Sequence, residues 1–202
     1  TYLTDLQTIA AQNPNNRHLQ FRNSLMEALV SMASSRMADK VHAQMLLRQL
    51  VIDENFEWRW HLTMLGLLHL CDILIFEARA TGEGEAWEEA KTFLEQFYTR
   101  TKDQKNNEFL AEALLLQAKF ALIDGDLKQA QTYLSEAKTV ATELDRSLLI
   151  TRVEAEQSQL AKDFEKWTNL IYRNASLQER LREASLEEYL QKAQDALVRM
   201  SK

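Results

Sequence analysis

The chain repeats itself at an offset of 40 residues, and this repetition constrains its fold more than any other feature. Seven positions between residues 70 and 99 carry the same amino acid 40 positions later. The first copy has Leu70, Leu74, Ala78, Ala90, Thr92, Leu94 and Thr99, and the second has Leu110, Leu114, Ala118, Ala130, Thr132, Leu134 and Thr139. Repetition at such a period is typical of chains that stack helix pairs, because one pair alone cannot bury its apolar side. The sequence therefore predicts an array of helical hairpins.

The composition favours helices throughout. The 202 residues include four glycines and a single proline, Pro14, whereas Leu, Ala, Glu, Gln and Lys, all good helix formers, dominate. The length is sufficient to bury one sizeable core. We therefore predict an all-α fold in which residues 1–202 form one helical-repeat domain.

Breaks between the apolar-periodic segments set the expected helices. Residues 81–84 are a clear stop, and Gly125 followed by a capping Asp126 suits a tight reversal between two helices. The segment from Leu62 to Phe76 is apolar on almost every side, which predicts a helix buried at the centre of the molecule. The expected helices cover about residues 4–12, 17–34, 37–54, 57–80, 85–101, 108–123, 127–144, 147–172 and 177–197. The helix at 37–54 is expected to bury a stripe formed by Val41, Met45, Leu46, Leu50 and Val51.

The expected helices group into two repeat copies and a closing segment. The copies lie at about residues 57–101 and 108–144, and residues 147–200 would form capping helices. In the helix at 147–172, apolar spacings of three and four are typical of a coiled-coil seam. The seam consists of Ile150, Val153, Gln157, Leu160, Phe164, Trp167 and Ile171. Since the run is barely three heptads, we favour a long capping helix over a dimer zipper, and self-association through residues 150–171 stays open. Because the chain begins at a threonine, we expect it to be a fragment of a longer array.

The second copy carries small residues where two helices would approach closely. Its first helix has Leu114, Ala118 and Ala121, and its second has Ala130, Leu134 and Ala137. In this respect the chain resembles the tetratricopeptide-repeat family, with the best match over residues 110–141. The period of 40 differs from the usual period of about 34 in that family, and the closing proline and the aromatic pair are missing. The resemblance implies an α-solenoid of antiparallel helix pairs, with a concave face that binds a peptide or protein segment.

That resemblance also implies which residues would line the concave face. They come from the first helix of each copy: Asp72, Ile75, Arg79, Glu112, Leu115, Lys119 and Leu122. Their mixture favours a partner segment with an apolar anchor flanked by charges, since buried apolar contact supplies affinity and charge pairs supply specificity. The alternative is that these residues are merely solvated or cover another repeat.

Composition and spacing argue against several other partners. A net charge of −6 without a basic stripe does not favour nucleic acid. The apolar run from Leu62 to Phe76 is short for a membrane span and contains His69 and Asp72. The single cysteine, Cys71, cannot form an internal disulfide, and no signal peptide opens the sequence. We therefore expect a cytoplasmic protein with no membrane or nucleic-acid partner.

No reaction can be read from the sequence. His61 and His69 are two helical turns apart, too far to share a metal ion, and no serine or cysteine lies in a recognisable nucleophile motif. We predict no enzymatic activity, no cofactor and no metal, but a non-catalytic protein–protein interaction or scaffold module. The alternative is a ligand-sensing regulatory domain of a larger signalling protein, with a small molecule held near Trp58, His61 and His69. Trp58 and Trp60 would point to opposite sides of their helix, one packed and one free to anchor a partner.

Overall fold

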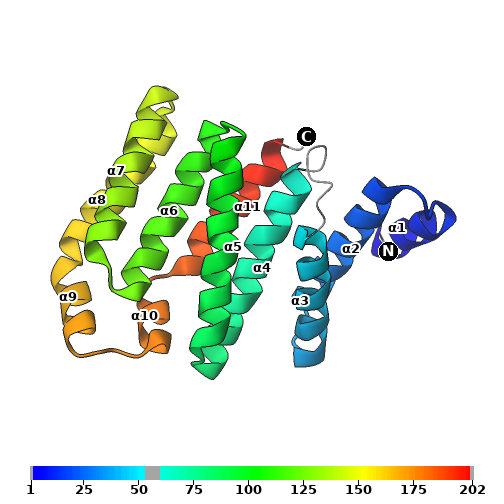
Figure 1. Cartoon of the computed structure of the whole chain (residues 1–202), viewed down its shortest axis with the longest axis horizontal. Helices are drawn as coiled ribbons and strands as arrows, with labels where there is room; N and C mark the ends of the chain where they lie inside the picture. Colours follow the sequence, from blue (N-terminus) through cyan, green and yellow to red (C-terminus); the bar gives the residue numbers. More distant parts are fainter. Residues whose placement is uncertain (1, 53–59, 201–202) are drawn as a thin grey trace.

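The computed structural model describes residues 2–52 and 60–200, and all regular secondary structure in these two ranges is helical (Figure 1). The prediction of an all-α fold is therefore confirmed for the described residues. The helices are α1 (Tyr2–Gln12), α2 (Arg17–Met32), α3 (Met37–Ile52), α4 (Trp60–Thr81), α5 (Gly84–Asp103), α6 (Asn107–Asp124), α7 (Leu127–Glu143), α8 (Ser147–Lys162), α9 (Phe164–Tyr172), α10 (Leu177–Glu183) and α11 (Leu186–Met200).

Tight turns connect the helices, as the reversal between α6 and α7 illustrates. Gly125 ends α6 in the left-handed conformation, with φ of 89°, which a residue without a side chain adopts at little cost. The carboxylate of Asp126 then accepts a hydrogen bond of 2.9 Å from the backbone N–H of Gln129 and caps α7. The predicted roles of glycine and aspartate at this turn are confirmed.

Successive helices pack against one another along the chain. The pairs α2–α3, α4–α5 and α6–α7 each make extensive contacts, and α5 also contacts α6, so that the two sequence copies lie next to each other. Figure 1 shows α3 to α7 running side by side with alternating directions. One continuous hydrophobic core extends from Phe21 of α2 to Leu197 of α11.

Helix α4 lies at the centre of this core, as the sequence predicts. It contacts α2, α3, α5, α10 and α11, and Leu67, Leu70 and Leu74 have no exposed surface. With 22 residues it is also the one described helix that is long and apolar enough to cross a membrane. The prediction that this segment is too short to do so is therefore wrong. Most of α4 is nevertheless buried among its neighbours, and this burial accounts for its apolar sequence.

The predicted single helix over residues 147–172 is wrong. The chain bends at Asp163, which separates α8 from α9. The bend brings Ile171 against the α6–α7 turn, where an added Cβ on Gly125 would lie 3.3 Å from Ile171 Cγ1. Trp167 and Leu170 of α9 are thereby buried in the common core.

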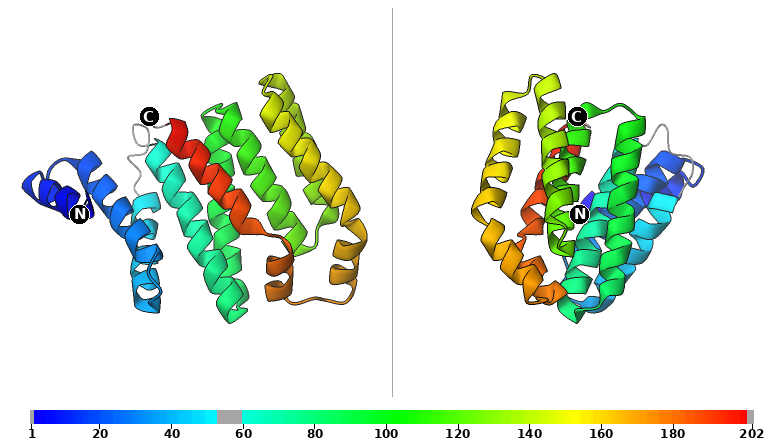
Figure 2. Two further views of the ribbon diagram at one scale, coloured as in Figure 1. Left: turned by 180° about the vertical axis from the view of Figure 1, so that it is seen from behind. Right: turned by 60° about the vertical axis from the view of Figure 1, so that its left-hand side comes forward.

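The segment after α9 does not extend the end of the array. Figure 2 shows α10 and α11 returning along the back of the molecule, where α11 crosses α4 and α6. Both helices contact α4 and α6. The predicted closing segment is therefore helical, but it covers a face of the array in addition to its end.

Candidate functional site

The seven residues predicted to bind a partner come from two neighbouring first helices. Asp72, Ile75 and Arg79 belong to α4, and the other four to α6. We call the surface that carries them the α4–α6 face. The apolar members Ile75, Leu115 and Leu122 are buried, because α10 and α11 pack on α4 and α6.

Helix α11 covers the α4–α6 face with a regular set of apolar side chains. Their exposed fractions lie between 0 and 7 %. Successive members are three, one, three and four positions apart: Leu186, Tyr189, Leu190, Ala193 and Leu197. The opposite side of α11 is exposed and polar, with Glu187, Glu188, Gln191, Lys192 and Asp195. This is the pattern by which an amphipathic helix is held in a groove.

Arg79 fastens α10 and α11 to the end of α4. Its guanidinium donates to Oε1 of Glu187 on α11 through Nη1, and to the carbonyl oxygen of Leu181 on α10 through Nη2, at 3.1 Å. Gln178 Nε2 in turn donates to the carbonyl oxygen of Arg79 at 3.0 Å. The predicted partner-facing arginine thus binds the C-terminal segment of the same chain.

A second polar contact joins α6, α8 and α11 around Tyr189. Arg152 Nη1 on α8 donates to Glu112 Oε1 on α6 at 2.5 Å, and Lys119 Nζ lies 3.0 Å from Glu156 Oε2. The same ammonium group lies 4.3 Å from the centre of the Tyr189 ring. We call these five residues the Tyr189 cluster.

Burial perturbs the carboxyl groups of this region. It raises the pKa of Glu112, although the positive charge of Arg152 acts in the opposite direction. It likewise raises the pKa of Asp72, against the charges of Lys40 and Arg79. Both carboxyls thus lie near basic side chains of the chain itself; Glu112 is buried and Asp72 is half-buried.

The two helices that carry the α4–α6 face are covered by α10 and α11. All seven predicted residues lie on helices that α10 and α11 contact, and Arg79 and Lys119 interact directly with residues of these two helices. An external segment could reach the buried apolar members of the face, Ile75, Leu115 and Leu122, only after α11 has left it.

The region of α4 proposed for a ligand site contains two buried ring nitrogens, Trp60 Nε1 and His69 Nδ1, that have no hydrogen-bond partner among the described residues. Trp60 is buried and meets the rings of His61 and Phe109 at centroid distances of 4.9 and 5.3 Å. Burial lowers the pKa of His69 to about 4 and raises that of Cys71. Trp58 lies outside the described residues. Within residues 2–52 and 60–200, no three or more His, Cys, Asp or Glu side chains are grouped to hold a metal ion.

A cavity of about 630 Å³ lies on the opposite side, between α5, α6 and α7. Several of its polar groups are bonded to each other: Lys91 Nζ lies 3.0 Å from Asp124 Oδ2, and Gln117 Nε2 donates to Glu95 at 2.8 Å. Trp87 Nε1 donates to the other oxygen of Asp124 at 2.7 Å. These bonds tie α5 to α6.

Sequence reasoning missed an exposed apolar surface on α3. The predicted buried stripe is partly wrong, because Val41 and Met45 point outward while Leu50 and Val51 are buried. Exposed fractions of 49–71 % characterise four residues that we call the α3 stripe: Met37, Val41, Met45 and Ile52. The signal was present in the sequence, since apolar residues occupy two sides of this helix and only one side can face the core.

Comparisons of the chain with protein-family models, with curated proteins and with solved structures find no match. The resemblance to tetratricopeptide repeats therefore depends on the residues of the chain alone and stays a prediction.

Proposed function

We propose that the chain is a tetratricopeptide-like α-solenoid that acts as a non-catalytic protein–protein interaction module, and that its α4–α6 face binds a helical segment. The observation that carries this proposal is the seating of α11, whose apolar residues pack on this face while its polar residues face water. A surface that holds one amphipathic helix in this way has the shape and chemistry to hold another.

The contacts of α11 specify the partner. A competing helix needs apolar residues with the spacing of Leu186, Leu190, Ala193 and Leu197, because these positions supply the buried surface. It needs an acidic residue directly after the first anchor, as Glu187 binds Arg79. An aromatic ring in the position of Tyr189 would meet Lys119. The partner proposed here is therefore an acidic amphipathic helix.

The tether of α11 controls access to the face. A helix attached to its own groove has an effective concentration on the order of millimolar, so a free helix at lower concentration competes poorly. Burial of each large apolar side chain of α11 contributes about 1.5–3 kcal/mol. Binding of a partner therefore requires a tighter helix than α11 or an event that loosens α11. A cytoplasmic location belongs to the same proposal, and the single buried thiol of Cys71 is compatible with it.

A peptide with the sequence of residues 184–200 tests this proposal. In the full chain carrying Leu190→Glu, the tethered helix is weakened, and the labelled wild-type peptide should bind in its place with a dissociation constant of roughly micromolar order. Fluorescence anisotropy measures the binding. The unmodified chain should bind this peptide at least tenfold more weakly, because its own α11 occupies the face.

Two controls make the result decisive. A peptide that itself carries the Leu190→Glu change should not bind either protein. If the variant fails to fold by circular dichroism, the milder Glu187→Ala removes only the Arg79 contact and serves the same purpose. A folded, loosened variant that ignores the wild-type peptide would contradict the proposal.

A further inference from the structure

Helices α3, α5 and α7 are the second helices of the hairpins α2–α3, α4–α5 and α6–α7. The side of α3 that faces solvent differs from the corresponding sides of α5 and α7. On α5 the exposed side chains include Glu85, Glu88, Thr92, Glu95 and Thr99, and on α7 they include Lys128, Gln131, Thr132, Ser135, Glu136 and Glu143. On α3 the exposed positions are Met37, Ala38, Val41, His42, Met45, Gln49 and Ile52, among which no lysine, arginine or carboxylate occurs. Only α3 thus presents an apolar outer side without a permanent charge among these three helices.

The α3 stripe has the geometry of a helix-packing surface. Met37, Val41 and Met45 are spaced by four residues and Ile52 follows seven later, so all four lie on one side of the helix. The 16 residues of α3 give the stripe a length of about 24 Å. Two of its four side chains are methionines, which adapt their shape to an opposing surface.

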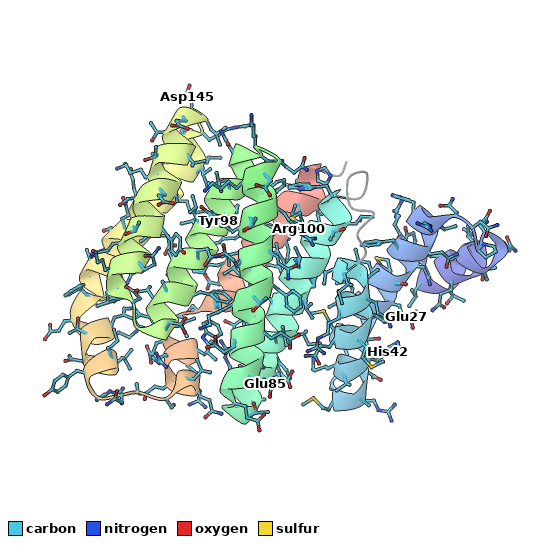
Figure 3. The ribbon with its side chains drawn as sticks, in the orientation of Figure 1. Glu27, His42, Glu85, Tyr98, Arg100 and Asp145 are labelled. Atoms are coloured by element: carbon cyan, nitrogen blue, oxygen red, sulfur yellow. The ribbon has the colours of Figure 1, made fainter. Side chains whose placement is uncertain are left out.

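Polar pairs border the stripe on both sides. On one side Arg48 donates through Nε and Nη2 to Glu89 of α5, at 2.8 and 2.6 Å. On the other, His42 Nε2 lies 3.0 Å from Glu27 Oε1 of α2, and Figure 3 shows these two side chains together. The groups at both borders already have partners within the chain. A docking surface that meets this stripe therefore needs an apolar centre and no excess of either charge at its edges.

The chain's own α3 stripe meets these requirements. The net charge of −6 makes two copies repel each other, and the carboxylates on α5 and α7 would add to this repulsion at any contact through those helices. Two α3 stripes carry no such charges, and each Arg48–Glu89 border contains one positive and one negative group. The other border adds a single carboxylate, Glu27, which is bound to His42. An apolar surface is also complementary to itself, as an isologous interface requires.

We propose that the α3 stripe is a self-association surface on which a second copy of this chain docks through its own α3 stripe. The two helices run antiparallel about a twofold axis near Met45, an orientation in which their dipoles attract. Met37 of each copy then lies near Ile52 of the other. This inference does not depend on the proposed function of the α4–α6 face.

The proposed location differs from the seam at residues 150–171, which the sequence left open as a surface for self-association. The seam at residues 150–171 is used inside the chain, since Val153, Leu160 and Trp167 are buried in the common core. Among the described helices, α3 carries the most exposed large apolar residues, namely the four of the α3 stripe. One helix side is smaller than the roughly 800 Å² per partner of a stable interface, so we expect a dissociation constant of about 10–100 µM.

Sedimentation equilibrium from about 1 µM to about 1 mM tests the proposal. The average mass of the unmodified chain should rise from 23.5 kDa toward twice that value. Met45→Glu, at an exposed position, should leave the fold intact and keep the mass at that of the monomer, because it places two carboxylates beside the axis. The matched control is Leu148→Glu on α8, where an 88 % exposed leucine lies away from the stripe, and it should associate like the unmodified chain.

Thiol cross-linking supplies a second, geometric measurement. A short bis-maleimide should join two copies of the Met45→Cys variant rapidly, whereas Thr132→Cys on the outer side of α7 should stay monomeric. The native Cys71 does not interfere because it is fully buried, and burial raises the pKa of its thiol. A constant monomer mass, a dimer that survives Met45→Glu, or equal cross-linking of both cysteine variants would each overturn the proposal.

Discussion

Two helix surfaces of this molecule differ in whether another helix covers them. The α4–α6 face is covered by α11, whose anchor residues are 0–7 % exposed, whereas the α3 stripe is left with exposed fractions of 49–71 %. The α4–α6 face combines three aliphatic with four charged side chains, whereas the α3 stripe is apolar throughout, and the two surfaces lie on neighbouring hairpins. An apolar helix face thus indicates that another surface packs on it. That surface is either a distant segment of the same chain or another molecule.

The cover of the α4–α6 face is also fixed by polar contacts that the α3 stripe lacks. Arg79 binds both α10 and α11, and Tyr189 lies over Lys119. The polar groups next to the α3 stripe are instead directed to α2 and α5. Polar contacts to the covering helices thus distinguish the α4–α6 face, which the chain itself covers, from the α3 stripe.

The largest expected difference between the two surfaces is in stability. Leu190→Ala leaves a cavity under α11 and should lower the free energy of unfolding by about 2–5 kcal/mol. Met45→Ala removes an exposed side chain and should change it by less than about 0.5 kcal/mol. Urea unfolding followed by circular dichroism measures both. Equal effects would mean that α11 is no better buried than the α3 stripe.

A buried histidine on the central helix makes stability depend on pH. Burial lowers the pKa of His69 to about 4 in the folded chain, below its ordinary value of about 6.5. Between these values the unfolded chain binds more protons, so stability is full above pH 6.5 and is lost as the pH falls toward 4, by roughly 2–3 kcal/mol. His69→Gln should remove this part of the pH dependence in urea titrations at pH 7 and pH 5. An identical loss in both proteins would exclude His69 as its source.

A substitution in the α6–α7 turn, against which Ile171 of α9 packs, should have a smaller effect on stability. Gly125→Ala forces a side chain into the left-handed region and toward Ile171, and should destabilise the fold by about 1–2 kcal/mol. Gly84→Ala is the matched control, because nothing lies within 4 Å of its added Cβ. Thermal unfolding should lower the melting temperature of the first variant alone. A comparable loss of stability in both variants would contradict the explanation by the positive φ of Gly125 and the closeness of Ile171.

The smallest predicted effect concerns the polar closure of the face. Arg79→Met loses the contacts to Glu187 and to the Leu181 carbonyl and should cost about 0.5–1.5 kcal/mol. Lys138→Met removes an ion pair that is exposed on both sides and should cost less than about 0.5 kcal/mol. Chemical denaturation of the two variants in parallel measures the difference. If Lys138→Met is the more damaging change, Arg79 is not what holds α10 and α11.

Local sequence signals predicted the hairpins well. Gly125 and Asp126 end and begin helices as expected, and the expected helices at 108–123 and 127–144 match α6 and α7 within one residue at each end. These features depend on residues near one another in the chain, whose conformational preferences are strong. The bend at Asp163 was missed because the apolar spacing continues through it with little change.

The covering of the α4–α6 face by α10 and α11 was not predicted, for a different reason. Repeat register placed the seven residues on one face, and α10 and α11 pack on the helices that carry them. Register cannot say that residues 186–197 return to cover them, because that contact joins segments about a hundred positions apart. The amphipathic pattern of Leu186, Leu190 and Leu197 was visible, but it does not name the surface on which it packs.

Hydrogen exchange of the backbone amides, read by mass spectrometry, tests the central claim most directly, because it compares α11 with the helices it covers. If α11 closes the α4–α6 face, its amides should be protected nearly as strongly as those of α4 and α6. Exchange of α11 at the rate of an isolated helical peptide, with α4 and α6 still protected, would contradict the account.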